Sequence, residues 1–208
     1  MEVYRCPNPE EQIYRPSDDT YLLTETLLGS REDLHRSRII LDLGTGSGYI
    51  AQQICLELIK KDFFHEIVAI DISPCSIEYM RKHLSRECAD HIFLIQCDGA
   101  SCLREESIDL VALNPPYLPV NERSTWLEIS WSGGERGVDK AVEMVKSVLK
   151  PLSRRGSLYI VLSSLGDLGY FENSMEAEGL IYRIIARKKL FFEELVVYKL
   201  KQHYSELL

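Results

Sequence analysis

Short apolar runs alternate along this chain with segments of helical periodicity. The runs at 39–43, 66–71, 91–98, 108–113 and 157–162 are rich in Ile, Leu and Val, and they predict buried strands. Amphipathic segments that begin near Ser17, Gly48 and Ser73, and two more over 142–149 and 167–178, predict helices. This alternation predicts an α/β fold, with a parallel sheet, right-handed crossovers and helices on both faces.

Both ends of the chain and one internal segment depart from this alternation. The first 16 residues contain three prolines and predict irregular structure, while 118–134 predict a long loop or a broken helix. Segments 180–186 and 190–200 lie close enough to form a hairpin, which would make one strand antiparallel. Without repeats or a linker, we expect one domain over 1–208, in which residues 1–35 form an extension and a helix that covers the ligand site.

Acidic residues end each of the first three predicted strands. Asp42, Asp71 and Asp98 stand at carboxyl ends, where open α/β sheets bind their ligands. The loop Gly44-Thr45-Gly46-Ser47-Gly48 follows Asp42, and glycines let backbone approach a ligand because they have no Cβ. Asp71 ends the second strand, where an acid accepts hydrogen bonds from both hydroxyls of a ribose.

Two classes of cofactor compete for such a site. A dinucleotide needs a seat for its pyrophosphate, usually G-x-G-x-x-G, whereas the spacing here is G-x-G-x-G. Asp42 and Asp98 would repel a diphosphate but suit a cation that carries an ammonium and an adenine N6 donor. S-adenosylmethionine has both groups and a sulfonium, so the pattern favours it over a dinucleotide or a relic site without catalysis.

The predicted fourth strand runs into Asn114-Pro115-Pro116-Tyr117, the four predicted catalytic residues. Two prolines remove two backbone donors and stiffen the chain, leaving a carboxamide, free carbonyls and an aromatic ring. That set suits a planar amino group: the Asn114 side-chain oxygen and the Pro115 carbonyl each accept one N–H, and Tyr117 stacks on the group. The alternative is a proline-terminated strand with Tyr117 in ordinary loop packing.

Together these residues resemble the class I S-adenosylmethionine-dependent methyltransferases, and within them the HemK-like family that methylates a glutamine of translation release factors. The likeness covers nearly the whole chain, including residues 14–20, 42–48 and the Gly133-Gly134-x-x-Gly137 turn. It implies a Rossmann-like seven-stranded sheet ordered 3-2-1-4-5-7-6. The cofactor contacts that we expect are Thr20, Asp42, Gly44, Gly46, Asp71, Asp98, Gly99 and Asn114.

The sequence lacks the additional N-terminal helical domain of the bacterial branch, so it is similar to the short eukaryotic and archaeal branch. That likeness implies methylation of the Gly-Gly-Gln glutamine of the class I release factor, and dependence on a small zinc-binding activator subunit. We expect the activator on strand 92–97, which would be outermost and lacks the charge or proline that protects edge strands. Asn-Pro-Pro-Tyr also occurs in adenine-N6 and guanine-N2 methyltransferases of nucleic acids, which remain the alternative, ahead of a non-catalytic scaffold.

Composition narrows the choice of partners and compartment. The net charge is −8, which argues against a partner bound by broad neutralisation of phosphates. Six cysteines form no C-x-x-C pair, so we expect free thiols in a reducing compartment, and neither cysteines nor histidines show metal spacing. The N-terminus has no apolar signal core and no stretch is long enough to span a membrane, so we expect the cytoplasm or the nucleus.

Overall fold

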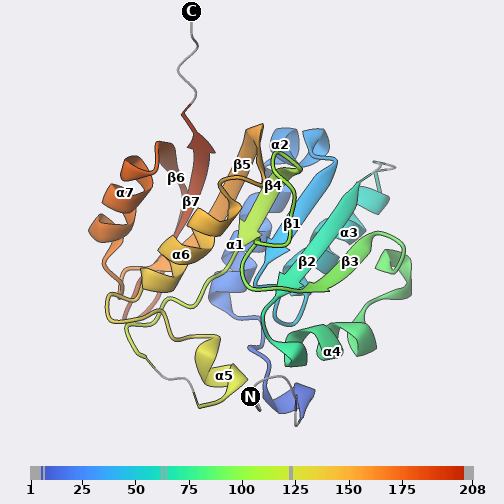
Figure 1. Cartoon of the computed structure of the whole chain (residues 1–208), viewed down its shortest axis with the longest axis horizontal. Coiled ribbons are helices and arrows are strands. Elements are labelled where there is room, and N and C mark those ends of the chain that lie inside the picture. Colours follow the sequence, from blue (N-terminus) through green and yellow to red (C-terminus); the bar gives the residue numbers. More distant parts are fainter. Residues whose placement is uncertain (1–5, 7, 62, 64, 122–123, 204–208) are drawn as a thin grey trace, which may run out of the picture.

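A single mixed sheet organises the computed structural model, which describes residues 6, 8–61, 63, 65–121 and 124–203. Its seven strands follow the order β3-β2-β1-β4-β5-β7-β6 (Figure 1), which confirms the predicted topology. In chain order the strands are β1 (Ile39–Leu43), β2 (Glu66–Asp71), β3 (Ile92–Gln96), β4 (Ile108–Leu113), β5 (Leu152–Ser163), β6 (Leu180–Lys189) and β7 (Glu194–Gln202). The first five strands pair in parallel, and β7 runs antiparallel to β5 and β6.

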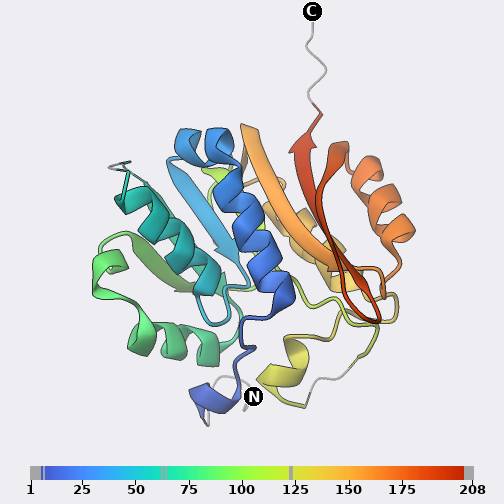
Figure 2. The same cartoon turned by 180° about the vertical axis from the view of Figure 1, so that it is seen from behind.

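Helices cover both faces of the sheet. The described helices are α1 (Asp18–Gly29), α2 (Arg31–Arg36), α3 (Tyr49–Ile59), α4 (Pro74–His83), α5 (Trp126–Ile129), α6 (Asp139–Val148) and α7 (Leu168–Ala177), with short 3-10 turns η1 (Pro9–Glu11) and η2 (Arg86–Cys88). Helices α6 and α7 lie over one face in Figure 1, and α1, α2 and α3 lie over the other face in Figure 2. Each face has its own apolar cluster, since the central strands are buried on both sides.

The carboxyl ends of the parallel strands lie at the lower edge of Figure 1, where α4, α5 and the N-terminal segment gather. Helix α4 begins there because the Ser73 hydroxyl accepts hydrogen bonds from the backbone of Cys75 and Ser76, and Pro74 takes the first turn. The long segment that was predicted as a loop or broken helix contains the single turn of α5. A capping box closes the start of that turn: the Thr125 hydroxyl accepts from the Glu128 backbone, and the Glu128 carboxylate accepts from the Thr125 backbone.

Several elements differ from the sequence prediction. In the hairpin, β6 continues to Lys189, beyond the predicted 186, and β7 begins at Glu194 instead of 190, because residues 190–193 form the turn. Strand β5 begins at Leu152, earlier than predicted, because the polar stretch before Ser157 still extends beside Ile108 of β4. Helix α2 was not predicted, because a single polar turn with one buried leucine, Leu34, has no detectable periodicity. Among the described residues, no helix is both long and apolar enough to cross a membrane.

The expectation that every cysteine is a free thiol is wrong for one pair. Cys6 and Cys75 form a disulfide, although 69 residues separate them. Local spacing carries no signal for such a pair, because only the folded N-terminal segment brings Cys6 to the first turn of α4. One argument for a reducing compartment is therefore lost, while Cys55 and Cys88 are buried free thiols as expected.

Candidate functional site

A cavity of about 620 Å³ opens at the carboxyl ends of the central strands. Its walls come from the glycine loop after β1, the end of β2, the segment after β3, the motif after β4, and residues of the N-terminal segment, α5 and α6. Seven of the eight predicted cofactor contacts line it, namely Thr20, Gly44, Gly46, Asp71, Asp98, Gly99 and Asn114. These residues are far apart in the sequence, and the parallel strand order brings them together.

The glycine loop turns sharply from β1 into α3. Gly44, Gly46 and Gly48 all have positive φ angles, of +74°, +53° and +75°, which side chains rarely adopt. At Gly48 an added Cβ would also lie 1.5 Å from the Met80 sulfur, so this residue lets α4 pack against the loop.

Asp42 lies behind this loop and is not part of the cavity wall. Its carboxylate accepts hydrogen bonds from Thr45 Oγ1 at 2.7 Å and from the Ala51 backbone N–H at 3.1 Å. Burial raises the pKa of Asp42 to about 6, and only 1% of the residue is exposed. The structure thus gives Asp42 a role in holding the loop, where the sequence predicted a contact with the cofactor.

Asp71 lines the cavity at the end of β2. One oxygen accepts from the Gly46 backbone and the other from the Ser73 backbone, each at 2.8 Å. Burial raises the pKa of Asp71, while these backbone donors oppose the rise. Hydrogen bonds from the Ser76 side chain and the Ile72 backbone also lower this pKa. Because Asp71 ends β2 at the cavity wall, it remains the acid that the hydroxyls of a ribose would meet.

Asn114 shows an unusual pattern of hydrogen bonds. Its side-chain nitrogen donates to Thr20 Oγ1 at 3.2 Å, and Thr20 Oγ1 donates in turn to Asp19 Oδ1 at 3.1 Å. This chain fixes which end of the carboxamide is nitrogen, because the Thr20 proton is committed to Asp19. The Asn114 oxygen is buried and has no hydrogen-bond partner. A buried acceptor without a donor is costly, and here it points to a donor that arrives with a ligand.

Asp19 joins the motif to the start of α1. Its second oxygen accepts from the hydroxyls of Tyr117 at 2.7 Å and Tyr14 at 3.1 Å. Burial raises the pKa of both tyrosines above their usual value, so they stay protonated and act as donors. Tyr117 is thereby anchored through its hydroxyl. Sequence reasoning missed Asp19 and Tyr14 as site residues, although both lie in the 14–20 segment that carries the family likeness.

The glycine turn at 133–137 supports the same motif from behind. A Cβ on Gly133 would lie 2.8 Å from the Tyr117 Cα, and one on Gly137 would lie 2.9 Å from the Tyr117 carbonyl oxygen. Gly137 also has a positive φ angle of +72°. Glycine at these positions lets the turn pack directly on the backbone of the motif.

A second cavity of about 330 Å³ reaches Asn114 from another side. It is lined by Tyr14, Ser17, Asp18, Asp19, Asn114, Pro115, Tyr117, Leu118, Ser130, Trp131, Leu190, Glu193 and Leu195. Pro116 lines the first cavity and Pro115 the second, while Asn114 belongs to both. The predicted catalytic residues therefore stand between two chambers.

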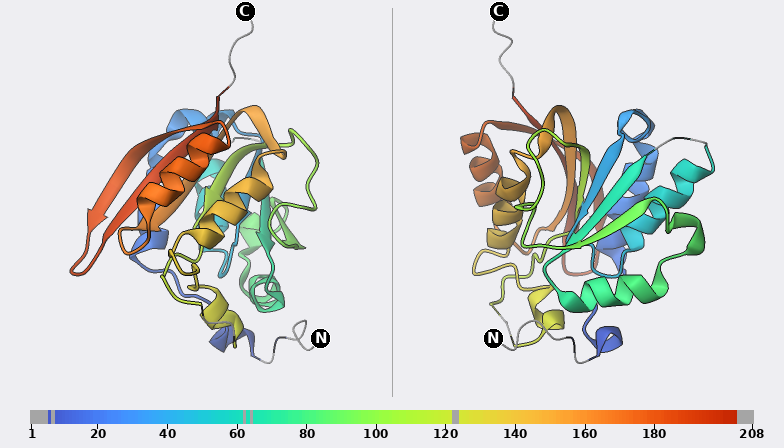
Figure 3. Two further views of the ribbon diagram at one scale, coloured as in Figure 1. Left: turned by 60° about the vertical axis from the view of Figure 1, so that its left-hand side comes forward. Right: turned by 45° about the vertical axis from the view of Figure 1, so that its right-hand side comes forward.

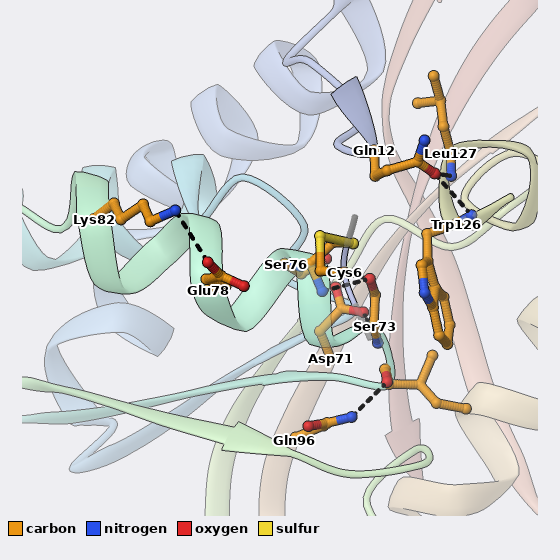
Figure 4. Close-up of a disulfide and its surroundings, with 12 residues drawn as sticks. Cys6, Gln12, Asp71, Ser73, Ser76, Glu78, Lys82, Gln96, Trp126 and Leu127 are labelled. Atoms are coloured by element: carbon orange, nitrogen blue, oxygen red, sulfur yellow. Dashed lines mark hydrogen bonds and ion pairs between the residues drawn. A yellow bond between two sulfur atoms is a disulfide. The ribbon is translucent and has the colours of Figure 1, made fainter. Parts of the chain in front are cut away.

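The N-terminal segment contributes Gln12, Tyr14 and Pro16 to the lining of the first cavity. The Gln12 side-chain oxygen accepts hydrogen bonds from the backbone of Trp126, at 3.1 Å, and Leu127, at the start of α5. Ile13 packs in an apolar cluster with Cys75, and the Cys6–Cys75 disulfide ties the segment to α4 beside Asp71 (Figure 4). Two elements at the rim, α4 and α5, are thus linked through residues that precede α1.

Comparison with known proteins identifies the family to which this chain belongs. A family model described as a methyltransferase domain matches residues 34–188. The chain belongs to this methyltransferase family. The likeness to HemK-like class I methyltransferases is confirmed by curated relatives that include a protein N5-glutamine methyltransferase of Methanocaldococcus jannaschii. That relative is 27% identical over 89% of this chain and 90% of its own length. The human methyltransferase HEMK2 is 28% identical over 81% of this chain and 79% of its own length.

Solved structures agree with this assignment. The methyltransferase resembles the Mtq2–Trm112 complex of E. cuniculi, with a TM-score of 0.71 and 26% identity over 92% of this chain and 99% of the other. That complex is described as responsible for methylating the translation termination factor eRF1. An S-adenosylmethionine-dependent methyltransferase of Aquifex aeolicus has a TM-score of 0.62 at 12% identity, over 93% of this chain and 98% of the other, and shares the fold.

Proposed function

We propose that this methyltransferase transfers a methyl group from S-adenosylmethionine to the side-chain nitrogen of a glutamine, the one in the Gly-Gly-Gln motif of a class I translation release factor. The observation that carries the proposal is the buried, unpartnered side-chain oxygen of Asn114, a residue that lines both cavities. A primary amide brings the N–H donor that this oxygen lacks. The similarity to a glutamine methyltransferase and to a complex that methylates eRF1 supports this choice of substrate.

The first cavity fits S-adenosylmethionine in size and in chemistry. Its volume of about 620 Å³ is within the range of cofactor pockets, and its glycines leave room for close approach. We assign the ribose hydroxyls to Asp71, and the rest of the cofactor to Thr20, Gly44, Gly46, Asp98, Gly99 and Asn114. When bound, the cofactor supplies an electrophilic methyl group.

The residues of the motif orient the amide nitrogen. Its lone pair is delocalised into the carbonyl, which makes it a poor nucleophile. With one N–H bonded to the Asn114 oxygen and the other to the Pro115 carbonyl, the nitrogen turns its lone pair toward the first cavity. Catalysis then comes mainly from orientation and from fixed dipoles. No base is required before attack, because the amide nitrogen becomes acidic once the new N–C bond forms and then releases its proton.

The second cavity argues against a nucleic acid as the substrate. Asp18, Asp19 and Glu193 line it, and carboxylates repel a phosphate backbone. The net charge of −8 acts in the same direction. Methylation of adenine or guanine is therefore the weaker alternative, although it could use the same Asn-Pro-Pro-Tyr motif.

We also propose a small activator subunit bound at β3. This strand is outermost in the sheet, and Phe93 on it is 48% exposed. The similar Mtq2 is found in complex with Trm112. The proposal has three further parts. The activator binds zinc, and the enzyme works in the cytoplasm or nucleus. Residues 1–35 cover the cofactor site within a single domain.

Transfer of a labelled methyl group tests it directly. The enzyme, with its activator, is incubated with methyl-labelled S-adenosylmethionine and either the release factor, the factor with Gly-Gly-Ala in place of Gly-Gly-Gln, or total RNA and DNA. We expect label only on the unaltered factor. Label on nucleic acid and not on the factor would overturn the proposed substrate.

A further inference from the structure

The turn between β6 and β7 carries two neighbouring phenylalanines with almost bare side chains. Phe191 is 91% exposed and Phe192 is 85% exposed. The next most exposed large apolar side chain among the described residues is Ile181, at 53%. The two rings meet edge to face with centroids 4.6 Å apart, so they form one apolar surface, here called the Phe pair. An apolar surface of this kind commonly marks a site of protein interaction.

The turn that carries the Phe pair is held on both sides. The Leu190 backbone N–H donates to the Glu193 carbonyl at 2.8 Å and closes the turn. Lys188 forms an ion pair with Asp18 at the start of α1, at 2.9 Å. The Glu193 side chain accepts a hydrogen bond from Ser163 at the end of β5. The Phe pair is thus presented in a fixed place relative to α1, whose next residues are Asp19 and Thr20.

The same turn forms a wall of the second cavity. Leu190 and Glu193, which flank the Phe pair, line this cavity together with Asn114 and Tyr117. The hairpin tip lies at the edge of the molecule that holds the carboxyl ends of the parallel strands, and it projects beyond the sheet (Figure 3, left). Because the residues on both sides of the Phe pair line this chamber, the pair lies next to it, within reach of a polypeptide that places a side-chain amide at Asn114.

We propose that the Phe pair is a docking platform for the protein substrate, and that it binds an apolar surface next to the loop that carries the reacting glutamine. This inference rests on the proposed function. A glutamine with two glycines offers little surface to grip, so affinity must come from contacts outside the second cavity. Exposed aromatic residues supply such affinity well, because they are rigid and bury large areas.

The proposed binding sites for the protein substrate and for the activator lie on different parts of the sheet. Strands β3 and β6 are the two opposite edges of the sheet, so a subunit on β3 leaves the β6–β7 tip free. The tip and the second cavity, by contrast, share the turn residues themselves.

The test compares a Phe191→Ser/Phe192→Ser variant with an Ile181→Ser control. Ile181 is an exposed apolar residue at the other end of the same hairpin, where it pairs with Lys201, and it lines neither cavity. With the activator present, we expect the double variant to raise the KM for the intact release factor at least tenfold. The kcat, the Kd for S-adenosylmethionine and the methylation of a short Gly-Gly-Gln peptide should change less than twofold, and the control should behave as wild type.

Direct binding of the release factor, measured in parallel, separates the two hypotheses. If wild type binds the factor without methylating it and the double variant loses that binding, the docking platform stands and the proposed function fails. An unchanged KM and unchanged binding in the double variant would overturn the platform. So would loss of the activator from the double variant, or a wild-type dimer in sedimentation that the double variant no longer forms. If wild type does not bind the factor, both ideas fall.

Discussion

Replacing Thr20 by valine removes one hydroxyl from the chain that orients Asn114. The two side chains have nearly the same shape and the same branching at Cβ, so the start of α1 should be kept. In the wild type the Thr20 hydroxyl accepts from the Asn114 nitrogen at 3.2 Å and donates to Asp19 at 3.1 Å. In the variant the partly buried Asn114 amino group loses its acceptor.

The magnitude follows from this lost partner. A buried polar group without a hydrogen bond costs about 1–3 kcal/mol, which equals about 5- to 150-fold in a rate. Asn114 can relieve the cost by rotating its amide, but the nitrogen then faces the substrate and repels its N–H groups. We therefore expect kcat to fall about 10- to 100-fold when both substrates are saturating.

Steady-state transfer of labelled methyl groups measures this, with Thr20→Ser as the matched control. Serine keeps the hydroxyl and should retain kcat within about threefold, on the basis of one lost buried methyl group. Because Thr20 also lines the first cavity, calorimetry with S-adenosylmethionine is needed beside the kinetics. A Thr20→Val enzyme with the turnover of Thr20→Ser would refute the orienting chain. A change in cofactor affinity alone would make Thr20 a cofactor contact and nothing more.

Four further outcomes are expected. Asn114→Ala should abolish transfer while S-adenosylmethionine still binds, and near-normal turnover would remove Asn114 from the mechanism. Asp71→Ala should weaken cofactor binding at least tenfold by calorimetry, since hydrogen bonds to a charged group contribute about 1.5–3 kcal/mol. Burial raises the pKa of Asp71, and only its charged carboxylate accepts hydrogen bonds from both ribose hydroxyls. The affinity of the wild type for S-adenosylmethionine should therefore be lost as the pH falls through that raised pKa. Asp71→Asn should lack this pH dependence, and equal pH profiles for the two proteins would contradict the assignment. Phe93→Lys on β3 should abolish co-purification with the activator in a chain that still folds and binds the cofactor, and retained co-purification would move the docking site elsewhere.

The elements that the sequence predicted well are those with a strong periodic signal. Strands β1, β2 and β4 have the predicted bounds, because each is a mainly apolar run between polar breaks. The sequence also predicted three parts of the site, because each of them stands at the end of a predicted strand: the glycine loop, Asp71 and the Asn-Pro-Pro-Tyr motif. The pattern could not separate the neighbouring acids Asp42 and Asp71 by role, since both end buried strands. The structure shows the difference: Asp42 accepts a hydrogen bond from Thr45 in the glycine loop, whereas Asp71 lines the cavity.

What the sequence could not supply is pairing across long separations. The contact between Tyr117 and Asp19 joins residues 98 positions apart, and the disulfide joins residues 69 apart. Carboxylates are common in the first turn of a helix, so the sequence alone gives no sign that Asp19 belongs to the site. Its importance depends on the aromatic hydroxyls that meet it in space.

Asp19 also bears on how the reaction proceeds. A buried carboxylate within reach of the motif is an obvious candidate for a general base, and Asp19 is only 2% exposed. One of its oxygens, however, accepts from the Thr20 backbone and hydroxyl, and the other accepts from Tyr14 and Tyr117. These four donors match the four acceptor positions of a carboxylate, so none is left for a proton of the substrate. Asp19 is therefore a positioning residue, which favours catalysis by orientation. Asp19→Asn should consequently lower kcat without shifting its pH profile, whereas a lost acidic limb in the kcat profile would make Asp19 the base after all.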